Sequence, residues 1–120
     1  PIHSVSTVKY IPYIVMSFVP GQDLQAYLNQ HGALSILDAL RIAYQVAEGL
    51  KAAHRQSIVH RDVKPGNILL EPSTMRATLT DFGLARVVDD VQMTYSGMIS
   101  GTPSFMSPEQ ATGGRVTQNS

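Results

Sequence analysis

The clearest pattern of apolar and polar positions lies between residues 36 and 56. Apolar residues recur there at steps of three and four, as they do on one face of an α-helix. The stripe consists of Ile36, Leu40, Ala43, Ala47 and Leu50, and it is widened by Leu37, Ile42 and Val46. Ser35 can cap the start of this helix, and Asp38 three residues later suits a capping box. We predict a helix that runs to about Gln56 and is largely buried.

Shorter patterns precede this helix. Two runs rich in Ile and Val, Ile2–Ser6 and Tyr13–Val19, predict the two strands of a hairpin. Pro20 and Gly21 end the second run, because both residues interrupt regular strands. The segment Asp23–Gln30 then predicts a short helix with one apolar face.

Brief strand patterns follow the long helix, at Ile58-Val59, Ile68–Leu70 and Ala77–Thr80. Pro72-Ser73 suits a hairpin turn between the last two. A short helix is predicted from about Ser107 to Thr112. Helices and paired short strands in one chain indicate the α+β class.

The polar stretch from Val87 to Gly101 shows no clear period. We interpret it as a loop. A loop of this length inside a compact domain is usually functional.

Composition excludes several classes of structure, partner and metal site. The 120 residues suffice for one domain with a modest core, and a hydrophobic content of 43% argues against disorder. Nine basic residues balance nine acidic ones, so charge gives no reason to expect nucleic acid or an anionic membrane as a partner. The absence of cysteine excludes disulfides and thiolate metal sites.

No segment is apolar for the roughly 20 residues that a membrane-spanning helix needs. We see no signal peptide either, and we expect a cytoplasmic location. The chain begins with Pro1 rather than Met, which we interpret as truncation of a longer protein. Whether that protein has a membrane anchor elsewhere is left open.

Three short motifs carry the candidate chemistry. They are His60-Arg61-Asp62-Val63-Lys64-Pro65-Gly66-Asn67, then Asp81-Phe82-Gly83, then Gly101-Thr102-Pro103-Ser104-Phe105-Met106-Ser107-Pro108-Glu109. In this order they resemble the H-R-D-x-K-x-x-N, D-F-G and G-T-P…P-E blocks of protein kinases. Lys64, two residues after Asp62, and the Gly-Thr-Pro sequence resemble the serine/threonine branch. The amino-acid sequence of residues 60–70 and 107–110 is similar to that of bacterial kinases of the eukaryotic type.

The resemblance implies catalytic and metal-binding roles. Phosphoryl transfer depends mostly on positioning and charge stabilisation. Asp62 would take up or orient the proton of the substrate hydroxyl, and Lys64 would steady Asp62 and the transferred phosphate. Asp81 and the side-chain carbonyl of Asn67 match the Mg²⁺-binding positions, since Mg²⁺ prefers oxygen ligands. Thr102 is expected to bond within the catalytic loop.

Other motif residues have structural roles by the same resemblance. His60 is expected to pack in the core near Phe82 rather than act as a base. Gly83 would let the backbone turn at the start of the activation segment. Glu109 would pair with an arginine beyond residue 120.

Residues 13–24 are similar to the kinase strand and hinge that hold adenine. The ATP-binding residues implied are Met16, Ser17, Val19, Asp23 and Leu69. The methionine would guard the back of the pocket, the serine and valine would offer backbone groups, the aspartate would reach the ribose, and the leucine would lie under the base. For the methionine and the leucine, ordinary core packing remains an alternative.

Arg61 suggests regulation. An arginine at this position commonly binds a phosphate on the activation segment, and a guanidinium pairs well with that charge. Thr94 and Ser96 are the candidate phosphorylation sites.

The resemblance spans essentially the whole chain but only the middle of a kinase domain. Residues 1–19 would be the end of the small lobe with the hinge, and residues 20–120 the first part of the large lobe. The sequence contains no G-x-G-x-x-G loop and no V-A-I-K lysine. We therefore expect a parent enzyme that uses ATP and Mg²⁺ to phosphorylate Ser or Thr of proteins, and a 120-residue piece that is inactive alone. Two alternatives are a pseudokinase or binding fragment, and a small-molecule phosphotransferase of the aminoglycoside kinase type.

Overall fold

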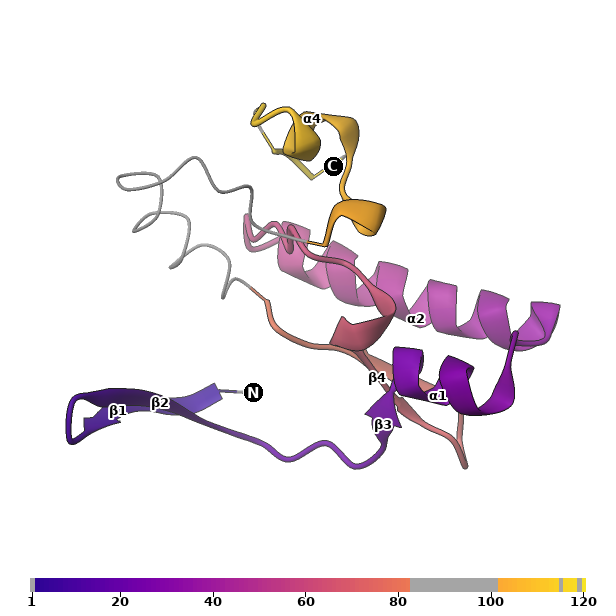
Figure 1. Cartoon of the computed structure of the whole chain (residues 1–120), viewed down its shortest axis with the longest axis horizontal. Helices are drawn as coiled ribbons and strands as arrows, with labels where there is room; N and C mark the ends of the chain where they lie inside the picture. Colours follow the sequence, from indigo (N-terminus) through magenta and orange to yellow (C-terminus); the bar gives the residue numbers. More distant parts are fainter. Residues whose placement is uncertain (1, 83–101, 115, 119) are drawn as a thin grey trace.

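The regular structure consists mainly of two small antiparallel sheets and two helices of unequal length (Figure 1). The computed structural model describes residues 2–82, 102–114, 116–118 and 120. Its elements are β1 (Ile2–Val8), β2 (Ile11–Met16), β3 (Gln22–Asp23), α1 (Leu24–His31), α2 (Ile36–His54), η1 (Pro65–Asn67), β4 (Ile68–Glu71), β5 (Arg76–Leu79), η2 (Pro103–Phe105) and α4 (Pro108–Ala111). The predicted loop at 87–101 lies outside the described residues. None of the described helices is long and apolar enough to cross a membrane.

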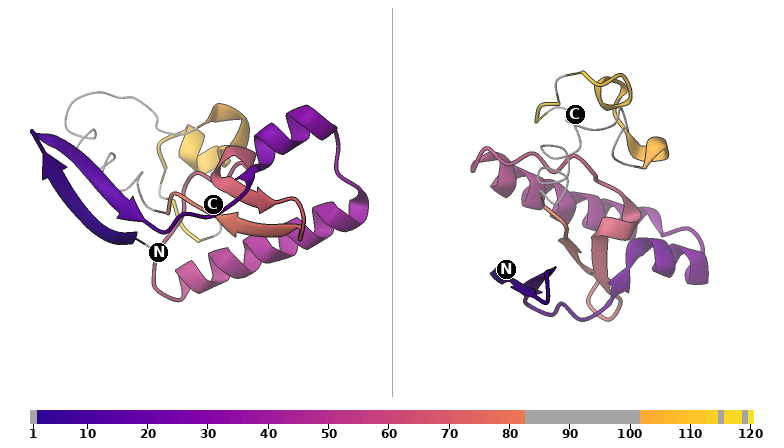
Figure 2. Two further views of the ribbon diagram at one scale, coloured as in Figure 1. Left: turned by 90° about the horizontal axis from the view of Figure 1, so that it is seen from below. Right: turned by 60° about the vertical axis from the view of Figure 1, so that its left-hand side comes forward.

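Strands β1 and β2 form a hairpin that is a sheet of its own. They pair antiparallel from Ile2 opposite Met16 to Val8 opposite Ile11. Lys9 and Tyr10 turn the chain with φ of 47° and 68°, the pair of positive angles that a tight two-residue hairpin requires. The predicted hairpin is confirmed, although β1 is two residues longer than predicted and β2 runs from Ile11 to Met16 instead of from Tyr13 to Val19. In Figure 2 the hairpin lies to one side of the helices and the second sheet.

The second sheet has the order β3-β4-β5. Strands β4 and β5 pair from Ile68 opposite Leu79 to Glu71 opposite Arg76, so the predicted hairpin around Pro72-Ser73 is confirmed. Strand β3 has only two residues, too few for a sequence pattern.

The strand predicted at Ile58-Val59 is wrong. The amide of Ile58 donates to the carbonyl of Ala53 at 3.0 Å. That bond satisfies the last turn of α2, so these residues finish the helix instead of joining a sheet.

Gly21 lies where β3 begins and approaches β4 closely. Its φ is +124°, and a Cβ there would stand 2.3 Å from the Leu70 carbonyl oxygen. Only glycine fits this approach without a shift of the backbone. The break predicted at Pro20-Gly21 thus brings the chain against β4.

Helix α2 begins after Ser35 as predicted, and α1 begins at Leu24, one residue after the predicted start. Asp23 caps α1, where its Oδ1 accepts from the amide of Ala26 at 2.8 Å. Ser35 caps α2, where its hydroxyl oxygen accepts from the amide of Asp38 at 3.1 Å. Helix α2 ends at His54, two residues before the predicted end.

The core lies between α1, one side of α2 and the sheet of β4 and β5. Its buried residues are Leu24, Ile42, Ile68, Leu70 and Leu79. Leu70, at 0% exposure, is at its centre. Gln45 ties α2 to the β4–β5 hairpin. Its amide donates to the Met75 carbonyl at 3.0 Å and accepts from the Ala77 amide at 3.0 Å.

The prediction that α2 is largely buried is wrong for this chain. Only Ile42 and Ala53 of the helix are buried. Ile36 is 81% exposed and Leu40 is 63% exposed. The helix packs on β5 along one edge of its apolar face, and nothing in the described residues covers the other edge.

Candidate active site

The segment between α2 and β4 carries the candidate catalytic residues. Residues 60–64 are irregular, and the short helix η1 then leads into β4. Arg61 has a φ of 70°, a left-handed conformation that a non-glycine residue adopts rarely. The turn at Arg61 sends the chain away from α2 and presents Asp62.

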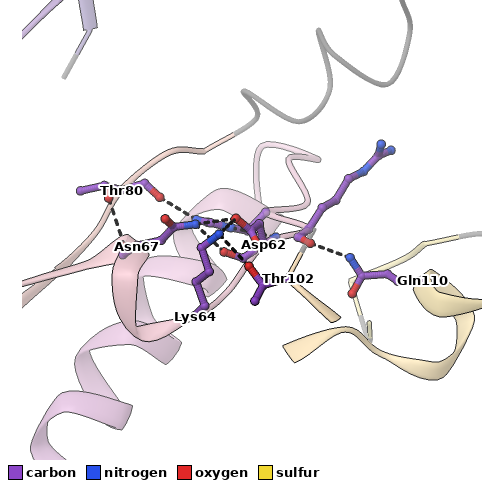
Figure 3. A network of polar contacts seen from close by, with 8 residues as sticks. Asp62, Lys64, Asn67, Thr80, Thr102 and Gln110 are labelled. Carbon is purple, nitrogen blue, oxygen red and sulfur yellow. Dashed lines mark hydrogen bonds and ion pairs between the residues drawn. The ribbon is translucent and has the colours of Figure 1, made fainter. Parts of the chain in front are cut away.

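The carboxylate of Asp62 is bound from two directions (Figure 3). Lys64 Nζ lies 2.7 Å from its Oδ2 and also donates to Thr102 Oγ1 at 3.0 Å. Asn67 Nδ2 donates to the same Oδ2 at 2.9 Å and to the Asp62 backbone carbonyl at 2.7 Å. Oδ1 accepts no hydrogen bond from any described residue in this network. The arrangement leaves one carboxylate oxygen available for a substrate hydroxyl.

Asp62 is a carboxylate held in its ionised form. Partial burial would by itself raise its pKa. The hydrogen bonds from Lys64 and Asn67 outweigh that effect, and the positive charge of Lys64 adds to them, so the pKa lies below the usual value of 3.8. Near neutral pH this group accepts hydrogen bonds and does not donate them.

Asn67 and Asp81 fit the hard-oxygen chemistry of a Mg²⁺ site. Asn67 is 7% exposed, and its amide nitrogen makes both hydrogen bonds to Asp62, which directs its carbonyl oxygen elsewhere. Thr80, the neighbour of Asp81, donates from its amide and its hydroxyl to the Asn67 backbone carbonyl, at 2.9 and 3.1 Å. This tie joins the segment that leads into Asp81 to the backbone of Asn67. No group of three His, Cys, Asp or Glu side chains suited to a metal occurs among the described residues, so phosphate and water would have to complete the coordination.

His60 is packed in the core and touches Phe82. It is 1% exposed, and the two rings meet edge to face with centroids 4.7 Å apart. The Asp62 amide donates to His60 Nδ1 at 3.3 Å, so the ring proton resides on Nε2, which lies 2.7 Å from the Thr80 carbonyl. The ring therefore connects the loop before Asp62 to the segment before Asp81.

Two of the five predicted ATP-binding residues lie directly opposite each other. Asp23 at the end of β3 pairs with Leu69 of β4. One oxygen of Asp23 caps α1, and Leu69 is half-buried.

Of the other three predicted ATP-binding residues, Met16 is the last residue of β2, and Ser17 and Val19 come after the hairpin. Met16 is 52% exposed and is not packed in the core. Ser17 shares a hydrogen bond with the ring of His3 at 2.9 Å between Oγ and Nε2. Val19 is half-buried. Met16 belongs to the sheet of β1 and β2, whereas Leu69 belongs to the sheet of β3, β4 and β5.

The residues predicted to be regulatory, and two predicted to be structural, Gly83 and Glu109, are only partly described. Thr94, Ser96 and Gly83 lie outside the described residues. Glu109 is in the first turn of α4, where a hydrogen bond from the Ser120 side chain lowers its pKa.

Sequence reasoning missed Gln110. Its Nε2 donates to the Arg61 backbone carbonyl at 2.5 Å, across 49 positions of the chain (Figure 3). A glutamine beside the Pro-Glu motif gives no periodic or compositional signal of such a contact.

The comparisons with known proteins agree with the motifs. The sequence pattern of the protein kinase domain matches residues 2–120. The serine/threonine-protein kinase PknA of Mycobacterium tuberculosis is 46% identical over 101 residues, which cover 84% of this chain and 23% of that protein. PknD of the same species is 41% identical over 117 residues, which cover 98% of this chain and 18% of that protein. The chain thus spans about a fifth of the length of these relatives.

A solved structure supports the fold. The crystal structure of Rad53 residues 1–466, in complex with AMP-PNP, matches with a TM-score of 0.65 at 34% identity, over 69% of this chain and 23% of that one. The kinase pattern matches almost every residue, and the relatives above are more than 40% identical over most of this chain. The chain therefore belongs to the protein kinase family, in the serine/threonine branch that occurs in bacteria.

Proposed function

We propose that this chain is the catalytic-loop part of an enzyme that transfers a phosphoryl group from ATP to serine or threonine hydroxyls of proteins. The observation that carries the proposal is the network of Asp62, Lys64, Asn67 and Thr102. It joins a loop to a segment 38 residues further along the chain. A network of this kind fixes a carboxylate and a cation relative to each other before any substrate binds, as catalysis by positioning requires.

Each residue of the network has a separate task in the proposal. Asp62 orients the acceptor hydroxyl through its unbonded oxygen and accepts its proton as the transfer proceeds. Lys64 neutralises charge on the transferred phosphoryl group while it keeps Asp62 in place. Asn67 and Asp81 would hold Mg²⁺, which supplies charge neutralisation at the ATP phosphates when bound. Thr102 holds the ammonium of Lys64 by accepting a second hydrogen bond from it.

The proposal also assigns the residues that contact the nucleotide and the boundary between the two lobes. Met16, Ser17, Val19, Asp23 and Leu69 would contact the adenosine part of ATP. The facing positions of Asp23 and Leu69 support this for the ribose and the base. We further propose that residues 1–19 belong to the small lobe, that the site works in the cytoplasm, and that Arg61 binds a phosphate on Thr94 or Ser96.

A small-molecule phosphotransferase remains the second candidate. Kinases of the aminoglycoside type share a catalytic loop like residues 60–67 but usually lack a segment like residues 101–109. The bond from Lys64 to Thr102 involves that segment directly and favours a protein acceptor. A pseudokinase finds no support in these residues, because Asp62, Asn67 and Asp81 are all present.

The experiment is phosphoryl transfer by the complete protein, with a serine/threonine peptide and with an aminoglycoside as alternative acceptors. Asp62→Asn keeps the size of the side chain but removes the proton acceptor, and we expect transfer to fall by about 10²- to 10⁴-fold. Asp38→Asn makes the same chemical change at the start of α2, and we expect activity within about twofold of the wild type.

Two results would contradict the proposal. One is an Asp62→Asn enzyme as active as the wild type. The other is phosphorylation of the aminoglycoside in preference to the peptide. The purified 120-residue chain, assayed in parallel, is expected to transfer no phosphate, since its sequence holds no Gly-rich loop over the phosphates.

A further inference from the structure

The peptide bond that leads into Asp62 is held at both of its polar atoms. Its carbonyl, which belongs to Arg61, accepts from Gln110 Nε2 at 2.5 Å. Its N–H, which belongs to Asp62, donates to His60 Nδ1 at 3.3 Å. Because the peptide unit is planar, two such bonds fix its orientation and so the direction in which the Asp62 side chain leaves the backbone.

This peptide follows a residue in an unfavourable conformation. Arg61 has a φ of 70°, and left-handed backbone at a residue with a Cβ persists only where surrounding contacts hold it. His60 is in turn tied to the Thr80 carbonyl at 2.7 Å. The N–H of the peptide is therefore held through His60, which is fixed in the core, and the carbonyl is held by Gln110.

The amide of Gln110 has one orientation that satisfies its neighbours. Its Oε1 accepts from the Ser107 amide at 3.1 Å and from the Ser107 hydroxyl at 3.2 Å. A reversed amide would put its oxygen against the Arg61 carbonyl and its NH₂ against the Ser107 N–H, which loses both bonds. The capping box of α4 thus aims the donor of Gln110 at the catalytic loop.

We propose that Gln110 is a positioning residue for Asp62 and acts through the peptide between Arg61 and Asp62. Its contact couples the first turn of α4 to the catalytic loop, so that the carboxylate is oriented only when α4 is in place. The inference rests on the proposed function for its effect on turnover, and on the geometry alone for its effect on the peptide.

The test is Gln110→Glu in the complete protein. A glutamate at this position keeps the acceptor of the capping box, because Glu is the usual partner of Ser there. It removes the donor and turns a carboxylate toward the Arg61 carbonyl. We expect kcat to fall about ten- to a hundredfold with the KM for ATP unchanged. Hydrogen exchange of the Asp62 amide should accelerate about tenfold, while that of Leu70 in β4 stays the same.

The matched control is Thr112→Ala. Thr112 donates to the Pro108 and Glu109 carbonyls within α4 at 3.0 and 3.3 Å, so its loss weakens the same helix without touching the catalytic loop. We expect its kcat within about twofold of the wild type and no change in exchange at Asp62.

The remaining outcomes contradict either the positioning role of Gln110 or the proposed function. Unchanged exchange at Asp62 in Gln110→Glu overturns the positioning role, whatever happens to kcat. Faster exchange with unchanged kcat overturns it as well, since the peptide would then not govern turnover. Equal losses in Thr112→Ala would assign the effect to α4 as a whole and overturn the proposal. A wild-type enzyme that phosphorylates no serine or threonine acceptor would refute the proposed function, while the exchange measurement would still test the Gln110 contact.

Discussion

In the proposed function the chemistry depends on the carboxylate of Asp62, and the surroundings of this group have two opposing effects on its pKa. Burial favours the neutral form, whereas Lys64 and Asn67 favour the charged form and prevail. A lowered pKa makes Asp62 a weak base in the resting state. It suits a group that first orients a hydroxyl and receives the proton only late in the transfer.

Replacing Lys64 should reveal the effect of burial on the pKa of Asp62. In Lys64→Met the hydrogen bond and the positive charge at 2.7 Å are lost, so we expect the pKa of Asp62 to rise above its wild-type value. Carbon-13 NMR titration of aspartate carboxyls in the complete kinase domain measures this directly. Lys51→Met removes the same charge from the exposed pair with Glu48 on α2 and should leave the Asp62 pKa unchanged. A pKa of Asp62 that stays at the wild-type value in Lys64→Met would contradict this account.

The pH dependence of stability has a definite sign. The folded-state pKa of Asp62 is lowered, so the folded protein binds this proton less readily than the unfolded chain does. Its stabilising contribution is complete above the unfolded value near 3.8 and is lost as pH falls through the folded pKa. In Lys64→Met the contribution is smaller and disappears at a higher pH. Acid titration of the unfolding midpoint in the two proteins checks this sign.

At the scale of single residues the sequence motifs carried most of the candidate site. Lys64, Asp62 and Asn67 lie within six residues, and so the spacing of the loop alone brings them together. A bond from Thr102 to the catalytic loop and the packing of His60 near Phe82 were also expected from the motifs; the structure has both, with Lys64 as the partner of Thr102. The Gln110 contact could not be expected, because it depends on how α4 lies against the loop.

At the scale of elements, Gln45 joins α2 to the β4–β5 hairpin. The side chain bonds to two backbone groups where the turn meets β5, the carbonyl of Met75 at the end of the turn and the amide of Ala77 in the strand. Met75 has a φ of 54°, so this turn needs external support. Gln45→Ala would leave both backbone groups without their partner.

We expect Gln45→Ala to lower the free energy of unfolding by about 1–3 kcal/mol, the usual cost of partly buried polar groups left unpaired. Urea unfolding of the complete kinase domain measures it. Gln25→Ala is the matched control, because among the described residues the Gln25 side chain bonds only to Asn29 on the exposed side of α1. It should change stability by less than about 0.5 kcal/mol. Equal effects of the two substitutions would show that the hairpin does not depend on Gln45.

Elements with strong local signals were predictable and the others were not. The cap at Ser35 gave the start of α2, since a cap is a local interaction, whereas Asp23 was predicted as the first residue of α1 and is instead its cap. Strand β3 escaped prediction because two residues acquire strand geometry only through pairing with Leu69 and Leu70. The strand predicted at Ile58-Val59 was wrong because the amide of Ile58 bonds to the last turn of α2 and does not pair with another strand.

At the scale of the whole molecule, the apolar face of α2 is wider than the surface that covers it. Ile36, Leu40 and Tyr44 follow one another at four-residue steps and are 81%, 63% and 69% exposed. Leu37 lies beside them at 58% exposure. Periodicity identifies which residues share a face, but it cannot say how much of that face a neighbouring element covers. The predicted burial of α2 failed for this reason.

An apolar stripe of this length at the surface favours association. We expect the 120-residue chain to form oligomers at micromolar concentration. The double substitution Ile36→Glu and Leu40→Glu should shift it toward the monomer in sedimentation velocity, because two like charges in the stripe repel the same stripe of a second copy. Gln25→Glu with Gln30→Glu adds the same charge at exposed polar positions of α1 and should leave the oligomers intact. If the unaltered chain sediments as a single monomeric species, the stripe does not drive association, and its side chains must find cover within one molecule.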